Sequence, residues 1–166
     1  MASAHALAAN APGSMVPSGS ALRALTLQFS EPAPSTPGLP SLWQGLARLT
    51  QLTQLRLDQA WGAEDAALED CLAAVRALSG LRRLTLSNVR ASCQQLEEAV
   101  AAMTQLTCLQ LAGVPVMQRL DLRSLPTSLV ELELPSACQV VDEWDPPQGV
   151  LFPELRHLKV SHTQIG

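Results

Sequence analysis

The chain has 166 residues, of which 47% are hydrophobic and 16% charged, and its formal net charge at pH 7 is −4. This composition is that of a folded globular protein rather than a disordered chain. The acidic balance argues against nucleic acid or anionic lipid as the partner, because both need a basic surface. No run approaches the roughly 18 consecutive apolar residues of a membrane span, so we expect none.

Residues 1–20 are rich in alanine, serine and proline, and they contain no acidic or basic residue apart from His5. A secretory signal needs a basic start and a continuous apolar stretch, and a transit peptide needs arginines. Because neither pattern is present, we predict a disordered tail over residues 1–20.

A short pattern, Leu-x-x-Leu-x-Leu, recurs six times in the rest of the chain, with valine as the last residue of the sixth copy. The first leucines of successive copies are 23 to 30 residues apart. Within each copy the last two apolar residues are two positions apart, so they share one face of a short strand. One such unit cannot bury its apolar face, whereas six stacked units form a continuous leucine core. The copies begin at Leu22, Leu52, Leu81, Leu106, Leu129 and Leu155.

The connections between the copies differ from one another. Ser30–Pro40 holds four prolines, which predicts an extended loop. Glu64–Leu78 predicts a helix that begins with two acidic residues and is followed by Gly80. Apolar steps of three lead into the second, third and fourth strands and suit a helical or 3-10 turn. These steps are Leu46, Leu49, Leu52; Val75, Leu78, Leu81; and Val100, Met103, Leu106.

The later connections are shorter or irregular. Ser92 and Gln95 have the spacing of a capping box that opens a helix. Val114–Leu125 is too short for a long helix, and Asp142–Gly149 predicts an insertion on the rim or convex side. The helix after Ser92 would turn three apolar residues inward, namely Leu96, Val100 and Met103.

These repeated residues resemble the signature of the leucine-rich-repeat superfamily over about residues 21–166. The resemblance implies an α/β solenoid of about six repeats, with short parallel strands on a concave sheet and helix, 3-10 turn and loop on the convex side. The second and third units resemble intracellular repeats of the ribonuclease-inhibitor or cysteine-containing type. The Leu125–Leu129 segment resembles the more extended types.

Two features depart from that family. It usually has asparagine or cysteine three residues after the last strand leucine, where the side chain bonds neighbouring backbone. With only two asparagines in the chain, no such ladder can form, and the turns must satisfy their backbone groups otherwise. In addition, no capping flank follows the last copy, so we expect an uncapped apolar edge. Either the sequence is part of a longer protein, or this edge pairs with another copy of the chain. The ladder positions hold Ser30, Ala60, Val89, Val114, Ala137 and Thr163.

Residues between the strand leucines point away from the core, toward the hollow of the predicted solenoid. Arg56 and Arg83 make the middle of this surface basic, and arginine is common at binding hot spots because it can grip a carboxylate with two hydrogen bonds. We therefore expect binding to centre on these two residues. The alternative is that an exposed sheet needs polar cover in any case, and that neighbours such as Glu133 and Lys159 merely pair. The predicted partner-binding residues are Gln54, Arg56, Asp58, Arg83, Thr85, Gln110, Glu131, Glu133, His157 and Lys159.

Motifs of catalysis and of cofactor binding are absent from the sequence. There is no Gly-rich phosphate loop, no dinucleotide-binding glycine motif, no His-Glu-x-x-His zinc motif and no Gly-x-Ser-x-Gly elbow. His157 and His162 lack a third metal ligand. We expect no catalytic residue, metal or cofactor. The cysteines are widely spaced and predict reduced, packed thiols in an intracellular protein; they are Cys71, Cys93, Cys108 and Cys138.

These observations predict a non-enzymatic interaction module in the cytoplasm, a scaffold or regulator that binds a protein partner without nucleic acid or membrane. One alternative is the substrate-recognition arm of a ubiquitin ligase, although no adaptor-binding domain precedes Ala21. Another is a structural component of the cytoskeleton or ciliary axoneme, which no residue specifically favours.

Overall fold

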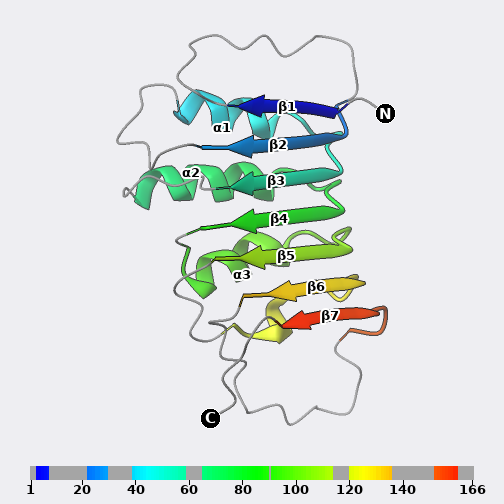
Figure 1. Cartoon of the computed structure of the whole chain (residues 1–166). Helices are drawn as coiled ribbons and strands as arrows, with labels where there is room; N and C mark the ends of the chain where they lie inside the picture. The colour runs from blue at the N-terminus through cyan, green and yellow to red at the C-terminus, as the bar shows by residue number, and fades with distance from the viewer. Residues whose placement is uncertain are drawn as a thin grey trace.

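Seven short strands form one parallel sheet in the computed structural model, and each strand pairs with the next one along the chain (Figure 1). The structure describes residues 3–7, 22–29, 39–58, 65–89, 91–113, 120–135 and 152–160. The predicted parallel α/β sheet is confirmed, with one strand more than the six leucine patterns. The strands are β1 (Ser3–Leu7), β2 (Ala24–Gln28), β3 (Gln54–Asp58), β4 (Arg83–Ser87), β5 (Cys108–Ala112), β6 (Glu131–Leu134) and β7 (His157–Val160).

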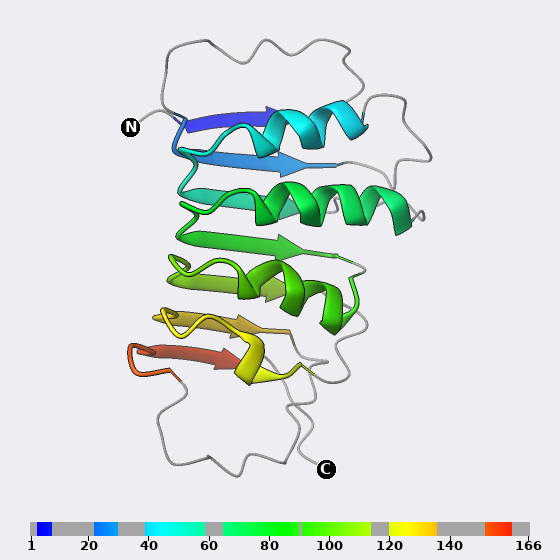
Figure 2. The same cartoon turned by 180° about the vertical axis from the view of Figure 1, so that it is seen from behind.

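The helices of the described residues all lie on one face of this sheet (Figure 2). Helix α1 spans Leu39–Ala47, α2 spans Asp65–Arg76, α3 spans Cys93–Ala101, and the 3-10 helix η1 spans Leu122–Ser124. No helix of the described ranges covers the opposite face, which is turned toward the viewer in Figure 1. We call this opposite side the open face.

Rows of leucine run across the strands on the helix side. Leu55 is in register with Leu84, Leu84 with Leu109, and Leu109 with Leu132, and each of these four side chains is at most 2% exposed. The predicted period-two strands with a shared leucine core are confirmed. Because alternate residues of a strand point to opposite faces, the residues between these leucines belong to the open face.

The apolar steps of three form tight turns that lead into the strands. The Leu49 amide donates to the Leu46 carbonyl at 2.9 Å, and the Leu52 amide donates to the Leu49 carbonyl at 2.8 Å. The same bonds recur before β4 and β5. This i to i+3 pattern is the 3-10 type, so the predicted helical or 3-10 approach to the strands is confirmed. The recurring sets are Val75, Leu78, Leu81 and Val100, Met103, Leu106.

One backbone carbonyl before each strand accepts two amides from the next repeat. The Arg23 carbonyl, for example, accepts from the Thr53 amide at 2.8 Å and from the Gln54 amide at 2.9 Å. Side-chain hydroxyls add to this carbonyl ladder, since Thr53 Oγ1 donates to the same Arg23 oxygen at 3.0 Å. Backbone groups are thus satisfied between repeats without asparagine. The accepting residues are Arg23, Thr53, Arg82, Thr107 and Val130.

Two residues with left-handed backbone follow β4 and β5. Asn88 has φ 57° and Gly113 has φ 60°, and a Cβ atom at Gly113 would overlap the Asn88 side-chain oxygen. Asparagine and glycine are the residues that adopt this conformation most readily. The Asn88 amide nitrogen Nδ2 also donates to Asp58 Oδ1 at 3.2 Å, which ties this turn to β3.

Helices α2 and α3 lie where the sequence predicts them. The Ser92 and Gln95 capping box is present, with bonds of 3.2 Å from the Gln95 amide to Ser92 Oγ and 3.0 Å from the Ser92 amide to Gln95 Oε1. Gly80 has another role than a helix end, because a Cβ atom there would lie 3.3 Å from the Thr50 carbonyl oxygen. The three predicted inward residues of α3 and the turn after it, Leu96, Val100 and Met103, are buried. On α2 the buried residues include Leu68, Leu72 and Val75.

The first strand lies inside the segment predicted to be a disordered tail. Ser3–Leu7 pairs in parallel with β2, so residues 3–7 differ from that prediction. Ala4 and Ala6 are in register with Leu25 and Leu27, and alanine at these places hides the repeat from a search for leucines. Sheet hydrogen bonds come from the backbone, so pairing does not depend on the leucine pattern.

Helix α1 begins inside the segment predicted to be an extended loop. Leu39 and Pro40 are its first two residues, and the loop prediction is wrong for them. Proline is tolerated in the first turn of a helix because its missing amide has no intrahelical partner there. The ring of Trp43 in α1 packs against Phe29 with centroids 6.0 Å apart.

The described part of residues 114–125 holds only η1, so the absence of a long helix is confirmed for residues 120–125. The predicted insertion at 142–149 and His162 lie outside the described residues, as do five of the six predicted ladder positions.

Candidate binding surface

The ten predicted partner-binding residues all belong to the open face. The strand register arranges nine of them in two rows that run across the sheet, and Asp58 lies beside Ser87 in a third row. The first row is Gln54, Arg83, Cys108, Glu131 and His157. The second row is Arg56, Thr85, Gln110, Glu133 and Lys159.

An ion pair joins two residues of the first row that the sequence places in sectors of opposite charge. Arg83 Nη2 on β4 lies 3.3 Å from Glu131 Oε2 on β6, so the pair reaches across the intervening strand β5. The side chains are 45% and 39% exposed. Exposed pairs contribute little to stability, so this pair mainly fixes where the two side chains lie.

Cys108 occupies the row position between Arg83 and Glu131. It is only 2% exposed although it belongs to the open face. Burial, followed by a hydrogen bond with Glu131, raises the pKa of its thiol to about 11, although the charge of Arg83 acts to lower it. The thiol is therefore neutral at pH 7. The sequence predicted Cys108 only as a packed thiol and not among the binding residues; its place at the strand position between Arg83 and Glu131 was the available signal.

Several other predicted residues pair with a neighbour on the next strand. Lys159 Nζ donates to Glu133 Oε1 at 2.6 Å, and Thr85 Oγ1 donates to Gln110 Oε1 at 3.0 Å. These contacts match the alternative interpretation, in which polar residues of an exposed sheet satisfy one another.

Arg56 is the predicted cation that is held least firmly. Its side chain is 56% exposed, and its Nη2 lies 3.9 Å from Asp58 Oδ2. That carboxylate also accepts the hydrogen bond from Asn88. Gln54 and His157 are exposed as well. The Arg56 guanidinium therefore keeps most of its donors for a ligand.

Charge is unevenly distributed over the described strands. Strands β2–β4, together with the residue before each, carry four exposed arginines and a single acid, Asp58. Strands β5–β7 and the residues before them carry two glutamates, Glu131 and Glu133, against Arg156 and Lys159. This part of the sheet is thus basic even though the chain is acidic. Arg56 and Arg83 lie on its open face, whereas Arg23 and Arg82 lie directly before their strands. We call the four arginines the basic sector: Arg23, Arg56, Arg82 and Arg83.

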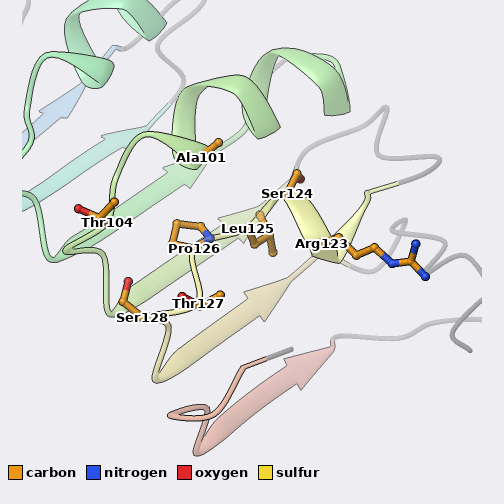
Figure 3. Close-up of a pocket in the computed structure, with 8 residues that line it drawn as sticks. All are labelled: Ala101, Thr104, Arg123, Ser124, Leu125, Pro126, Thr127 and Ser128. Carbon is orange, nitrogen blue, oxygen red and sulfur yellow. The ribbon is translucent and has the colours of Figure 1, made fainter. Parts of the chain in front are cut away.

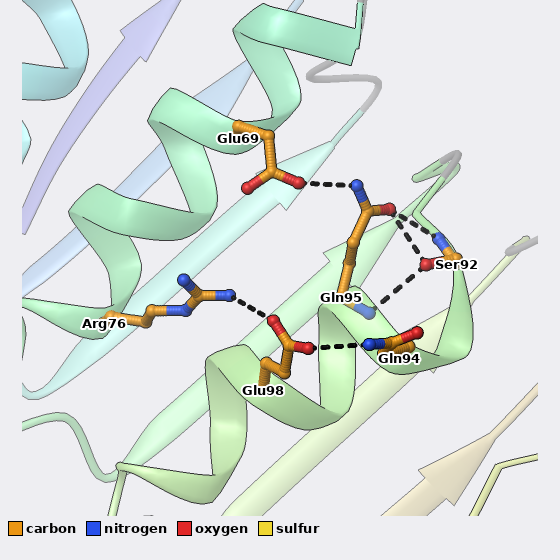
Figure 4. Close-up of polar contacts among 6 residues, drawn as sticks. All are labelled: Glu69, Arg76, Ser92, Gln94, Gln95 and Glu98. Atoms are coloured by element: carbon orange, nitrogen blue, oxygen red, sulfur yellow. Dashed lines mark hydrogen bonds and ion pairs between the residues drawn. The ribbon is translucent and has the colours of Figure 1, made fainter.

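Acidic side chains gather on the helix side and join α2 to α3 (Figure 4). Glu98 accepts from Arg76 Nη2 at 3.4 Å and from Gln94 Nε2 at 3.0 Å. Glu69 accepts from Gln95 Nε2 at 2.7 Å. Glu98 on α3 bonds a residue of α2, and Glu69 on α2 bonds a residue of α3, so these acids link the two helices.

A hollow of about 290 Å³ lies between the end of α3 and the connection from η1 to β6 (Figure 3). Its two serine hydroxyls donate to backbone carbonyls, Ser124 to Asp121 at 2.6 Å and Ser128 to Leu106 at 2.7 Å. The Arg123 side chain points away from the other lining residues. The hollow therefore offers few free polar groups to a ligand. Its lining is Ala101, Thr104, Arg123, Ser124, Leu125, Pro126, Thr127 and Ser128.

Among the described residues, no group of three or more histidine, cysteine, aspartate or glutamate side chains could hold a metal ion. Within the same ranges, no helix is long and apolar enough to cross a membrane. A comparison with models of known protein families finds no match, and a search of curated proteins finds none either.

Proposed function

We propose that this chain is a leucine-rich-repeat solenoid of the cytoplasm that binds a protein partner on the open face, as a non-enzymatic scaffold or regulator. The observation that carries the proposal is a polar sheet face with no described helix over it, bearing charges of both signs. Two free, buried thiols, Cys71 and Cys108, agree with a reducing compartment.

The repeat assignment is supported by features that recur at successive strands. Leucine rows, 3-10 approach turns and the carbonyl ladder appear in one repeat after another. A unit of this kind buries its apolar side only by stacking on its neighbours. In a solenoid built this way the open face would be the concave one.

The size of the open face limits how a partner can bind. Seven strands about 4.8 Å apart and about 16 Å long give a projected area below roughly 500 Å². A stable protein interface buries about 800 Å² on each partner. A partner must therefore also contact the turns at the sheet edge, or bind as a short segment.

The proposal is tested by photo-crosslinking in cells from two exposed glutamines of the full chain. A crosslinking amino acid at Gln54 probes the open face, and the same amino acid at Gln94 on α3 is the matched control. We expect discrete protein adducts from Gln54 and not from Gln94. The same adducts from both positions, or adducts from Gln94 alone, would contradict the proposal.

A further inference from the structure

We infer that the basic sector binds an acidic, extended segment of a partner polypeptide, and that Glu131 competes with this segment for Arg83. The inference rests on the proposed function, to which it adds the chemistry of the partner and a competitor within the chain.

The basic sector concentrates positive charge on one part of the sheet. All four of its arginines are exposed, and β2 and β4 contain no acidic residue. Arg23 and Arg82 lie two repeats apart, on either side of the repeat that contains Arg56. Like charges gathered over three successive repeats repel one another, so a ligand of opposite charge stabilises them.

The sheet places Arg56 and Arg83 near each other. Arg56 and Arg83 lie on adjacent strands, in neighbouring rows of the same face. Arginine forms paired hydrogen bonds with carboxylates, and the small projected area of the face suits a single extended segment. The uncharged side chains around these arginines, such as Gln54 and Thr85, can bond the backbone of that segment.

Glu131 already pairs with Arg83. Its carboxylate lies 3.3 Å from Arg83 in the free chain, in the place where a carboxylate of the partner would bind. Both side chains are partly solvated, so their bond is weak and reversible. A partner must displace Glu131 to use Arg83, whereas Arg56 is already accessible.

The same face argues against nucleic acid as the occupant. Strands β2–β7 carry no Phe, Trp or Tyr on the open face, so bases have no aromatic ring on which to stack. Glu131 and Glu133 lie on β6, two strands from β4, and would repel a continuing phosphate backbone.

The test measures fluorescence anisotropy of the full chain with a labelled peptide that alternates glutamate and serine. A peptide with glutamine in place of glutamate is the matched control, and labelled oligothymidylate and phosphatidylserine vesicles test the other anions. We expect Arg56→Gln to weaken binding of the glutamate peptide about three- to ten-fold. Glu131→Gln should tighten it about two- to five-fold.

Glu133→Gln is the control for Glu131→Gln, because it removes the same charge from the same strand but frees Lys159 instead of Arg83. We expect it to change binding less than two-fold; circular dichroism of each variant checks folding. Equal gains from both glutamine variants, equal binding of both peptides, or tighter binding of oligothymidylate or vesicles would overturn the inference. If Gln54 crosslinks a protein but the glutamate peptide does not bind, the inference fails alone. If Gln54 yields no adduct, the proposed function fails.

Discussion

The middle strand β4 and the last strand β7 of the sheet use the same strand pattern but bury it to different extents. Leu84 on β4 is fully buried between neighbouring strands and beneath the helices, whereas its counterpart Leu158 on β7 is 54% exposed. Helices α2 and α3 follow β3 and β4, whereas the described residues between β5 and β6 hold only the 3-10 helix η1. A leucine at a strand position therefore contributes to the core only when neighbouring elements cover it.

The largest effect that tests this comparison comes from truncating the two leucines. Leu84→Ala should lower the free energy of unfolding by about 2–5 kcal/mol, because it leaves a cavity in a packed core. Leu158→Ala, the same change at the exposed counterpart, should cost less than about 1 kcal/mol. Urea denaturation of both variants measures the difference. Equal losses of stability would mean that Leu84 and Leu158 are buried to the same extent.

A second test uses two glycines, Gly113 directly after β5 and Gly45 in α1. Gly113→Ala should destabilise the chain by about 1–3 kcal/mol, because alanine resists the positive φ and its Cβ atom would overlap Asn88. Gly45→Ala in α1 meets nothing within 4 Å and should stabilise the helix by up to about 1 kcal/mol. Thermal unfolding gives both signs, and a loss at Gly45 as large as that at Gly113 would refute the comparison.

A third test removes the cap of α3, the last α-helix of the described residues. Ser92→Ala should cost about 0.5–2 kcal/mol, because the Gln95 amide loses its acceptor and the capping box opens. Ser79→Ala, in an exposed turn, is the control and should change stability by less than about 0.5 kcal/mol. Chemical denaturation compares the two, and no difference between them would show that the cap is dispensable.

The smallest expected effect concerns the thiol of Cys108 on β5. Because burial raises the pKa of Cys108 to about 11 from 9.0, labelling of Cys108 should stay slow at pH 9 and accelerate as the pH approaches 11. The raised pKa stabilises the fold below pH 9, and this contribution is lost as the pH rises toward 11.

Glu131→Gln should lower that pKa and speed labelling at pH 9 a few-fold, because it removes a negative charge beside the thiol. Glu133 makes the smallest contribution to the shift, so Glu133→Gln is the control and should have a smaller effect. Peptide mass spectrometry of the Cys108 peptide follows the reaction. Unchanged labelling in Glu131→Gln would contradict the contact between the two residues.

Sequence alone predicted the features that depend on local spacing. The leucine strands, the 3-10 turns and the Ser92 capping box follow from periods of two and three and from a four-residue motif. β1 was missed because Ala4 and Ala6 stand where other strands have leucine, and the start of α1 was missed because prolines surround it. The Arg83–Glu131 pair was missed because it joins two strands that are not adjacent. The spacing of residues in the sequence does not show which side chains reach across an intervening strand.

The carbonyl ladder has a consequence for how the molecule can vary. Besides the strand pairing, one carbonyl oxygen before the strand bonds each repeat from β3 to β7 to the previous one, while the copies themselves are 23 to 30 residues apart. The alignment of the strands is thus set by backbone groups of the strands and of the turns before them, not by the length of the connection behind them. Segments can be lengthened, shortened or exchanged on the helix side while the spacing of the open-face side chains stays the same, so the helix side and the open face can diverge separately.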